Sequence, residues 1–351
     1  MSERIPPTEN LANSEYLLSE VKSFQAGVRD DVRTQLARQS AEELSKVVGE
    51  GEGDVSYKID AHAESHIDGF ARSLSTLSPL IMIAEGFGRK IYPAADSEPK
   101  LEVIIDPVDG TRGIMYDMRS AWVITGIAPH KDGGTTLDDI EMAVLTEIPP
   151  TKQDKASVLY AVKGQGAFEE LWDLREGGLV AKRELRTSKA TDLKHGFATF
   201  VDFFPGSKRE IADLSERVFE EAVGPVEEGK ALVFDDQYIC NAGQVYLLTK
   251  GVYRFVADLR PEMEKVLNRQ GKKLGMTAHP YDLAGLLIAK EAGAIVTNAW
   301  GQPVAYPLDT STNCSWIGYA NEDIRKRVEP VLLREIQVLH SKPISNTVVQ
   351  G

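Results

Sequence analysis

Apolar residues recur at helical spacing near the start of the chain. Between Glu15 and Val48 they stand three or four residues apart, which predicts a long amphipathic helical region. The positions are Leu17, Val21, Phe24, Val28, Val32 and Leu36. A second helix is predicted over Asp60–Leu77, with Ile67 and Phe70 facing inward and Ser78-Pro79 ending it.

Short apolar runs bounded by turn residues then predict strands. They cover residues 80–84, 101–105, 122–128, 141–145, 158–162, 195–201, 252–257 and 294–297, and a turn and strand follow at 164–168. Helices are expected over 208–222, 241–250 and 280–292. The pattern changes near residue 190, so we expect two α/β subdomains, 1–190 and 191–345.

The composition narrows the class of protein. The chain has 351 residues, 42% hydrophobic and 26% charged, with a net charge of −13. An acidic surface disfavours nucleic acid or an anionic membrane as the partner. Two cysteines, no signal peptide and no run of about 20 apolar residues predict a cytoplasmic protein.

The most informative segment is Asp106-Pro107-Val108-Asp109-Gly110-Thr111. It follows the apolar run 101–105, and its Pro and Gly favour a tight turn in which both carboxylates converge. Two carboxylates and the Val108 carbonyl are the oxygen ligands that Mg²⁺ prefers. Amides at Gly110 and Thr111, opening a helix, would suit a phosphate.

Turn formers and helix caps offer a simpler interpretation. Asp-Pro-x-Asp-Gly can be a turn only, Asp60 and Asp282 can cap helices, and Glu85 can be a solvated loop acid. The ordered set of four segments is harder to explain in this way.

This set resembles the inositol monophosphatase family, within the fructose-1,6-bisphosphatase-like superfamily. The matching residues are Asp60, Glu85, 106–111, then 281–285 (YDLAG) and 291–293 (EAG). The resemblance covers roughly residues 15–320. It implies a layered α/β/α/β/α sandwich with the site between the two halves, and a homodimer.

The resemblance also implies roles for residues. Glu85, Asp106, Asp109, Asp282 and the Val108 carbonyl would hold two or three Mg²⁺ ions. Asp60 and Thr111 would position and deprotonate a metal-bound water for direct attack on phosphorus, and the Gly110 and Thr111 amides would hold the phosphate. Sensitivity to Li⁺ is a property of many relatives.

The sequence departs from the family pattern at several positions, which bear on metal binding and on the substrate. Ala84-Glu85 keeps one acid where the family usually has two, and Tyr281 replaces the common Trp. Arg112 follows Thr111, and an insertion of about twenty residues begins after Asp258; Arg112 and Asp258 are the candidate substrate contacts. The insertion carries Lys265, Arg269, Lys272 and Lys273, either a solvated helix face or a lid that senses a second anionic group.

The expected function is therefore Mg²⁺-dependent hydrolysis of a small phosphate monoester, an inositol or sugar phosphate. One alternative is a 3′(2′),5′-bisphosphate nucleotidase or sugar bisphosphatase. Another, from a different class, is a phosphate-binding regulatory protein without catalysis. Fold alone does not choose among substrates.

Overall fold

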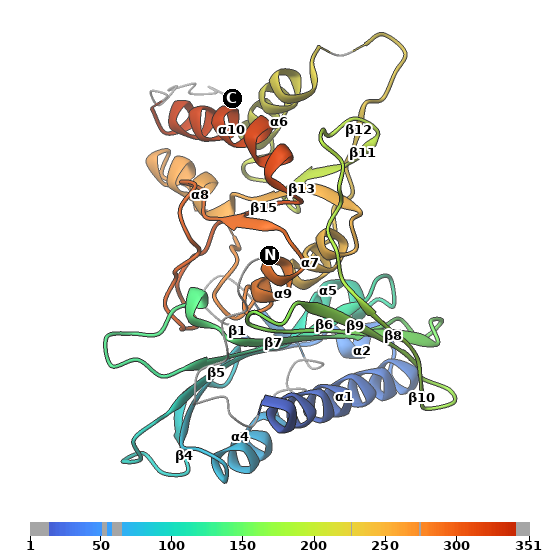
Figure 1. The fold of residues 1–351 in the computed structure, drawn as a ribbon, viewed down its shortest axis with the longest axis vertical. Helices are drawn as coiled ribbons and strands as arrows, with labels where there is room; N and C mark the ends of the chain where they lie inside the picture. The colour runs from blue at the N-terminus through green and yellow to red at the C-terminus, as the bar shows by residue number, and fades with distance from the viewer. Residues whose placement is uncertain (1–13, 51–54, 58–64, 226, 274, 342–351) are drawn as a thin grey trace.

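The computed structural model describes residues 14–50, 55–57, 65–225, 227–273 and 275–341. Two sheets lie one above the other, with helices below, between and above them (Figure 1). This is the layered α/β/α/β/α arrangement that the sequence predicts, and the fold class is confirmed.

The larger sheet has eight strands in the order β10-β9-β8-β7-β6-β5-β3-β4. Their bounds are β3 Leu80–Ala84, β4 Gly88–Tyr92, β5 Leu101–Asp109, β6 Ala121–Pro129, β7 Met142–Ile148, β8 Lys155–Val162, β9 Ala167–Asp173 and β10 Gly178–Glu184. Only β3 and β5 pair in parallel; the other neighbours are antiparallel.

The smaller sheet has five strands in the order β12-β11-β13-β15-β14. Their bounds are β11 Gly196–Phe200, β12 Val233–Phe234, β13 Tyr253–Asp258, β14 Ile295–Thr297 and β15 Trp316–Tyr319. A separate pair joins β1 Val47–Glu50 to β2 Val55–Tyr57. The change of sheet falls between Glu184 and Gly196. The division into subdomains 1–190 and 191–345 stays a prediction.

The helices sort by layer (Figure 1). Below the larger sheet lie α1 Ser14–Arg38 and α4 Ile67–Ser75; between the sheets lie α7 Asn241–Thr249 and α9 Leu286–Glu291; above the smaller sheet lie α6 Lys208–Val223, α8 Arg260–Arg269 and α10 Glu322–Ser341. The short elements are α2 Ala41–Leu44, α5 Thr111–Ile114 and the 3₁₀ turn η2 Leu137–Asp139.

Alternating side chains on the larger sheet fill two different cores. On β5, Val103 and Ile105 pack below with α1 and α4, whereas Ile104 packs above against the middle helices. Because both faces are covered, all nine residues of β5 are buried. This explains why apolar residues on β5 occupy both faces of the strand, as in Val103-Ile104-Ile105.

Several predicted boundaries were wrong. The first helical region ends at Arg38 rather than continuing to Val48, and Val47 already belongs to β1. The helix expected over 280–292 begins only at Leu286, because 280–285 form turns. The helix predicted from Asp60 is described from Ile67 onward, and residues 58–64 lie outside the described residues.

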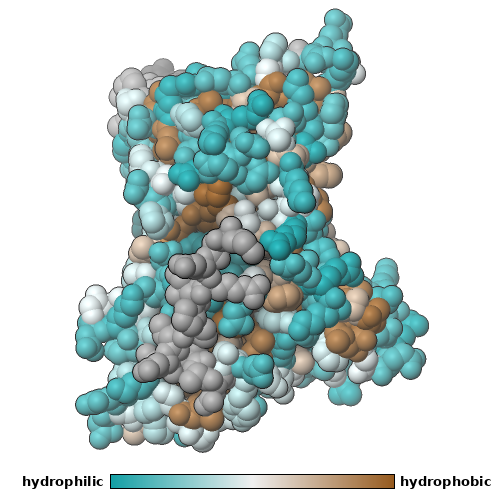
Figure 2. Space-filling model, in the orientation of Figure 1, coloured by the Kyte–Doolittle hydropathy of each residue, from teal (hydrophilic) through white to brown (hydrophobic). Residues whose placement is uncertain are grey.

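The surface shown in Figure 2 is mostly hydrophilic, and apolar colour gathers near the narrow region between the two sheets and at one edge of the broader part. Within the described part of the chain, no helix is long and apolar enough to cross a membrane.

We expect Gln25→Leu to destabilise the fold by about 2–4 kcal/mol. Gln25, on α1, is fully buried; its amide donates to Thr125 Oγ1 (2.8 Å) and the Val144 carbonyl (3.0 Å), and its carbonyl accepts from Thr146 Oγ1 (2.7 Å). Leucine would leave these buried groups without partners. Urea unfolding measures the change. Gln35→Leu, half-buried on the same helix, is the control and should change stability by under about 1 kcal/mol; equal effects would contradict the argument.

Candidate active site

Strand β5 carries Asp106 and Asp109 into the space between the two sheets. Its pairing with β6 is irregular between these two residues. There the Val108 amide donates to Asp106 Oδ1 (2.9 Å), and Thr111 Oγ1 donates to the Val108 carbonyl (2.9 Å). The strand therefore ends in a turn that its own side chains stabilise.

Gly110 makes this turn possible. Its φ is +98°, and a Cβ at this position would lie 3.1 Å from Cys240 Cβ and 3.4 Å from the Ala121 Cα. Both the left-handed backbone and the close approach favour glycine. Cys240 in turn caps α7, with its Sγ accepting from the Gly243 amide (3.2 Å). The turn after β5 is thus packed against the first turn of α7.

The other half of the molecule completes the site. The Ala242 amide, at the start of α7, donates to Asp109 Oδ2 (2.6 Å). The His279 amide donates to Asp282 Oδ2 (2.6 Å), in the turn that precedes α9. Asp282 therefore lies in a turn, not in the first turn of a helix as the sequence suggested.

Three carboxylates converge. Oxygen atoms of Asp106, Asp109 and Asp282 all lie within 4.8 Å of one another, and Asp106 and Asp109 are 1% and 7% exposed. Burial, with the charges of Glu85 and Asp109, raises the pKa of Asp106 well above its usual range. Burial and the charge of Asp282 do the same to the pKa of Asp109. Burial raises the pKa of Asp282 to about 6.

Such a cluster suits a hard divalent cation. The donors are all oxygens, the neighbouring Val108 carbonyl faces the same turn, and the carboxylates repel one another without a positive charge between them. The residues present therefore fit a hard divalent cation such as Mg²⁺, and Asp106, Asp109 and Asp282 are the side chains that would hold it.

The other residues that the sequence predicts for the site do not all lie beside the three carboxylates. Glu85 follows β3, and its amide donates to the Ile105 carbonyl (3.2 Å), which brings it beside Asp106. Arg112 contacts Met276 Sδ through Nη1 (3.5 Å). Asp60 lies outside the described residues. Asp258 is fully buried, so its carboxylate has no direct access to a substrate.

Sequence reasoning missed Arg260. It is 7% exposed and pairs with Asp258, and the charges of Asp282 and Asp109 act on it. The sequence does contain a signal for this residue. Arg260 stands two positions after Asp258, at the end of a predicted strand, which is a spacing that allows the two side chains to pair.

The insertion after Asp258 is a helix packed on the fold. Its first part forms α8, where Lys265 pairs with Glu262 (2.9 Å). Arg269 donates to the Leu339 carbonyl (3.2 Å), at the end of α10. These two cations are held by the protein itself, which disfavours a mobile lid; Lys272 and Lys273 are exposed.

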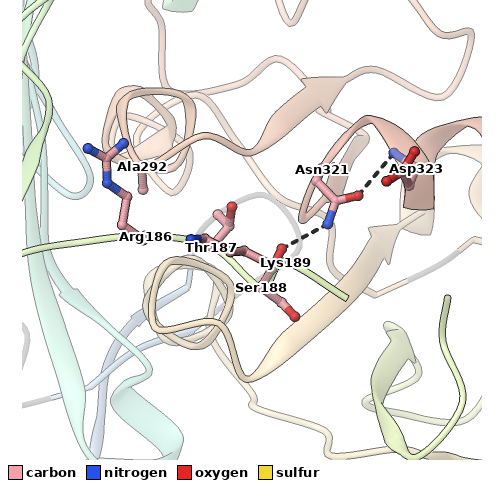
Figure 3. A pocket seen from close by; sticks show the side chains of 7 residues that line it. All are labelled: Arg186, Thr187, Ser188, Lys189, Ala292, Asn321 and Asp323. Carbon is pink, nitrogen blue, oxygen red and sulfur yellow. Dashed lines mark hydrogen bonds between the residues drawn. The ribbon is translucent and has the colours of Figure 1, made fainter. Parts of the chain in front are cut away.

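A cavity of about 310 Å³ lies apart from the carboxylates (Figure 3). The segment 186–189 between the two sheets lines it, with Ala292, Asn321 and Asp323. Asn321 donates to the Ser188 carbonyl (2.8 Å) and accepts from the Asp323 amide (3.0 Å). These bonds fasten the connecting segment to the start of α10.

Known proteins share this architecture. No family model matches the chain. The fructose-1,6-bisphosphatase/inositol-1-monophosphatase of Methanothermobacter thermautotrophicus is 22% identical over 297 residues, which cover 83% of this chain and 88% of the relative.

Solved structures have the same fold. The fructose-1,6-bisphosphatase of Leishmania major superposes with a TM-score of 0.65 at 12% identity, covering 96% of this chain and all of that one. A Pyrococcus horikoshii protein described as similar to inositol-1 monophosphatase gives 0.58 at 17% identity, covering 95% and 98%.

The layers and the acid cluster thus define a protein of the inositol monophosphatase and fructose-1,6-bisphosphatase fold class. The predicted resemblance to the inositol monophosphatase family is confirmed by these comparisons.

We expect Asp282→Asn to raise the melting temperature of the metal-free protein by roughly 1–4 °C above pH 6. The folded-state pKa is about 6 against an ordinary value of 3.8, so the wild type loses stability as pH rises through this interval, whereas the amide does not titrate. Below about pH 4 the difference should vanish. Differential scanning calorimetry in chelator measures it.

Asp309→Asn is the matched control, because the pKa of Asp309 is lowered in the folded protein whereas that of Asp282 is raised. Burial alone would raise the pKa of Asp309, but bonds from Thr312 Oγ1 (2.7 Å) and from the Thr312 and Ser311 amides lower it. This variant should lose stability at neutral pH. A loss of stability in both variants would refute the proposed repulsion at Asp282.

Proposed function

We propose that this protein is a Mg²⁺-dependent phosphatase that hydrolyses a small phosphate monoester, such as an inositol or sugar phosphate. The observation that carries the proposal is the convergence of three mutually repelling carboxylates from both halves of the chain. The relative from Methanothermobacter and the fold of the solved structures support a phosphatase of this type.

In this proposal, one group of residues binds the metal ions and another binds the phosphate. Asp106, Asp109 and Asp282, with Glu85 and the Val108 carbonyl, would hold two or three Mg²⁺ ions. Bound Mg²⁺ would offset the charge on the phosphate and lower the pKa of a coordinated water. Gly110 and Thr111 amides would hold the phosphate oxygens in the turn after β5.

The reaction itself is a direct in-line displacement. A water oxygen forms a bond to phosphorus, the ester P–O bond breaks, and the leaving alkoxide takes a proton from solvent water. Thr111, whose hydroxyl donates to the Val108 carbonyl, would help to orient the water, and the Asp60 carboxylate would receive its proton. No protein nucleophile is required, and both cysteines are buried free thiols.

A regulatory phosphate-binding protein without catalysis is the competing class. We also propose that the protein is located in the cytoplasm and forms a homodimer. Analytical ultracentrifugation would test the homodimer. Release of inorganic phosphate from any ester at a rate that depends on the carboxylates would exclude the non-catalytic alternative.

Activity should require Mg²⁺. We expect phosphate release from at least one member of a panel of inositol, sugar and nucleotide phosphates in Mg²⁺, and none after exhaustive chelation. Ca²⁺ should inhibit, because it tolerates looser geometry and longer bonds than Mg²⁺; Li⁺ is a further expected inhibitor. Full activity after chelation would overturn the metal assignment.

Asp109→Asn should keep the fold and lower kcat by about two to four decades, since a direct metal ligand is worth about 3–5 kcal/mol in the transition state. The amide oxygen can still accept from the Ala242 amide, which now contacts Asp109 Oδ2. Steady-state kinetics and circular dichroism measure the two effects. Asp132→Asn, on a fully exposed side chain, is the control; a near-normal kcat in Asp109→Asn would show that the site lies elsewhere.

A further inference from the structure

A polar cavity of about 310 Å³ lies at the joint between the two sheets (Figure 3). One wall is the segment 186–189, which connects β10 of the larger sheet to β11 of the smaller one. The other walls are Ala292 at the end of α9, and Asn321 and Asp323 at the start of α10. The volume lies at the lower end of the range of small-molecule sites, about 300–1,000 Å³, so the cavity has room for a small metabolite.

Hydrogen bonds hold the walls of this cavity together. The Thr187 amide donates to the Ala292 carbonyl (3.3 Å), which fastens the connecting segment to the end of α9. Asn321 Nδ2 donates to the carbonyls of Ser188 (2.8 Å) and Ala190 (2.9 Å), which fastens the same segment to the start of α10. Because this backbone is held before any ligand binds, binding costs less free energy for ordering the site.

Several polar groups of the cavity are left for a ligand. Among the residues that the structure describes, no hydrogen bond or ion pair reaches Lys189 Nζ or Thr187 Oγ1. Arg186 donates to Glu184 through Nη2, so its Nε and Nη1 remain as donors. The Ser188 hydroxyl can donate as well. This wall therefore presents donors from four consecutive residues, two of which are cations.

The charges of the cavity favour a phosphate group. Arg186 and Lys189 stand on the same wall, in a chain whose net charge is −13. A phosphate monoester carries about −1.5 to −2 at neutral pH, so two cations match it better than they match a single carboxylate. A guanidinium also pairs with phosphate oxygens through two N–H groups. Figure 3 shows Asp323 at the other end of the cavity from Arg186, where its carboxylate can accept from a ligand hydroxyl.

We propose that this cavity binds a small phosphorylated metabolite, with the phosphate on Arg186 and Lys189 and a ligand hydroxyl on Asp323. None of the lining residues belongs to the carboxylate cluster, so the site is distinct from the candidate active site. Binding here goes beyond the proposed phosphatase function and does not depend on it. The contacts come from segments far apart in the sequence, so the ligand binds the folded chain and raises its melting temperature.

Isothermal titration calorimetry in chelator tests this binding. Without a divalent cation, the carboxylates of Asp106, Asp109 and Asp282 repel a phosphate, so binding at the active site does not interfere. The probes are glucose 6-phosphate and glycerol 3-phosphate. Glucose and glycerol lack the phosphate, and glycerate carries a carboxylate instead. At least one phosphorylated probe should bind with a Kd of about 0.01–1 mM, and its counterparts should bind at least about tenfold more weakly.

Arg186→Ala/Lys189→Ala should weaken this binding by about tenfold or more, because both cations are removed. Lys152→Ala/Lys155→Ala is the matched control: it removes the same charge in the turn before β8 and at the first residue of β8, and it should leave Kd unchanged. All four side chains are exposed, so both double variants should fold, which circular dichroism checks. Asp109→Asn should bind the phosphorylated probe as the wild type does.

Failure of both phosphorylated probes to bind would overturn the proposal. Unchanged binding in Arg186→Ala/Lys189→Ala, or an equal loss in Lys152→Ala/Lys155→Ala, would do the same. Loss of binding in Asp109→Asn would place the phosphate at the carboxylates and would also refute the cavity site. Cavity-dependent binding without Mg²⁺-dependent hydrolysis of any ester would refute the phosphatase while supporting the site. Hydrolysis without binding at the cavity would refute the site alone.

Discussion

The repulsion among Asp106, Asp109 and Asp282 is the constraint on which the rest of the structure depends. Three carboxylates within 4.8 Å of one another, two of them buried and one partly buried, oppose folding unless surrounding elements hold them. β5 is buried along its whole length, and the first amides of α7 and the turn before α9 bind two of the carboxylates. The surrounding core supplies the stability that this cluster removes.

Close packing of the middle layer sets the geometry of the cluster. A Cβ at Gly285 would lie 2.7 Å from Leu145 Cδ2, so glycine lets the turn containing Asp282 lie directly on the larger sheet. Glu291, at the end of α9, accepts from the Gly164 and Gly166 amides (2.8 Å each) and fixes the same helix to the hairpin between β8 and β9. Gly285 and Glu291 therefore have a structural role, which is to hold the turn and helix that follow Asp282 against the larger sheet.

The net charge of the chain does not describe the charges around the carboxylate cluster. The net charge is −13, yet a buried Arg260 lies at the edge of the acid cluster, with its own acid beside it. Lys265 and Arg269 are bound to other groups of the protein, and Lys272 and Lys273 are exposed, so the charges of these four residues are not directed at the cluster in the way that the charge of Arg260 is. The position of a cation in the fold therefore says more about the ligand than the number of cations in a segment.

The sequence alone identified most strands and the acids, because short apolar runs and Asp106-Pro107-Val108-Asp109-Gly110-Thr111 are local signals. The layered fold class was implied by the family resemblance that these residues carry. It missed the turn at 280–285, where Pro280 and Gly285 are poor helix formers and Gly285 packs closely on Leu145, and it missed α10. The resemblance implied that Asp282 meets the acids of β5, and the tertiary structure shows how the turn before α9 brings it there. Only the tertiary structure shows that the charge of the buried Arg260, and not that of a more conspicuous lysine, acts on this cluster. Both depend on contacts between residues far apart in the chain, which local propensity and spacing do not encode.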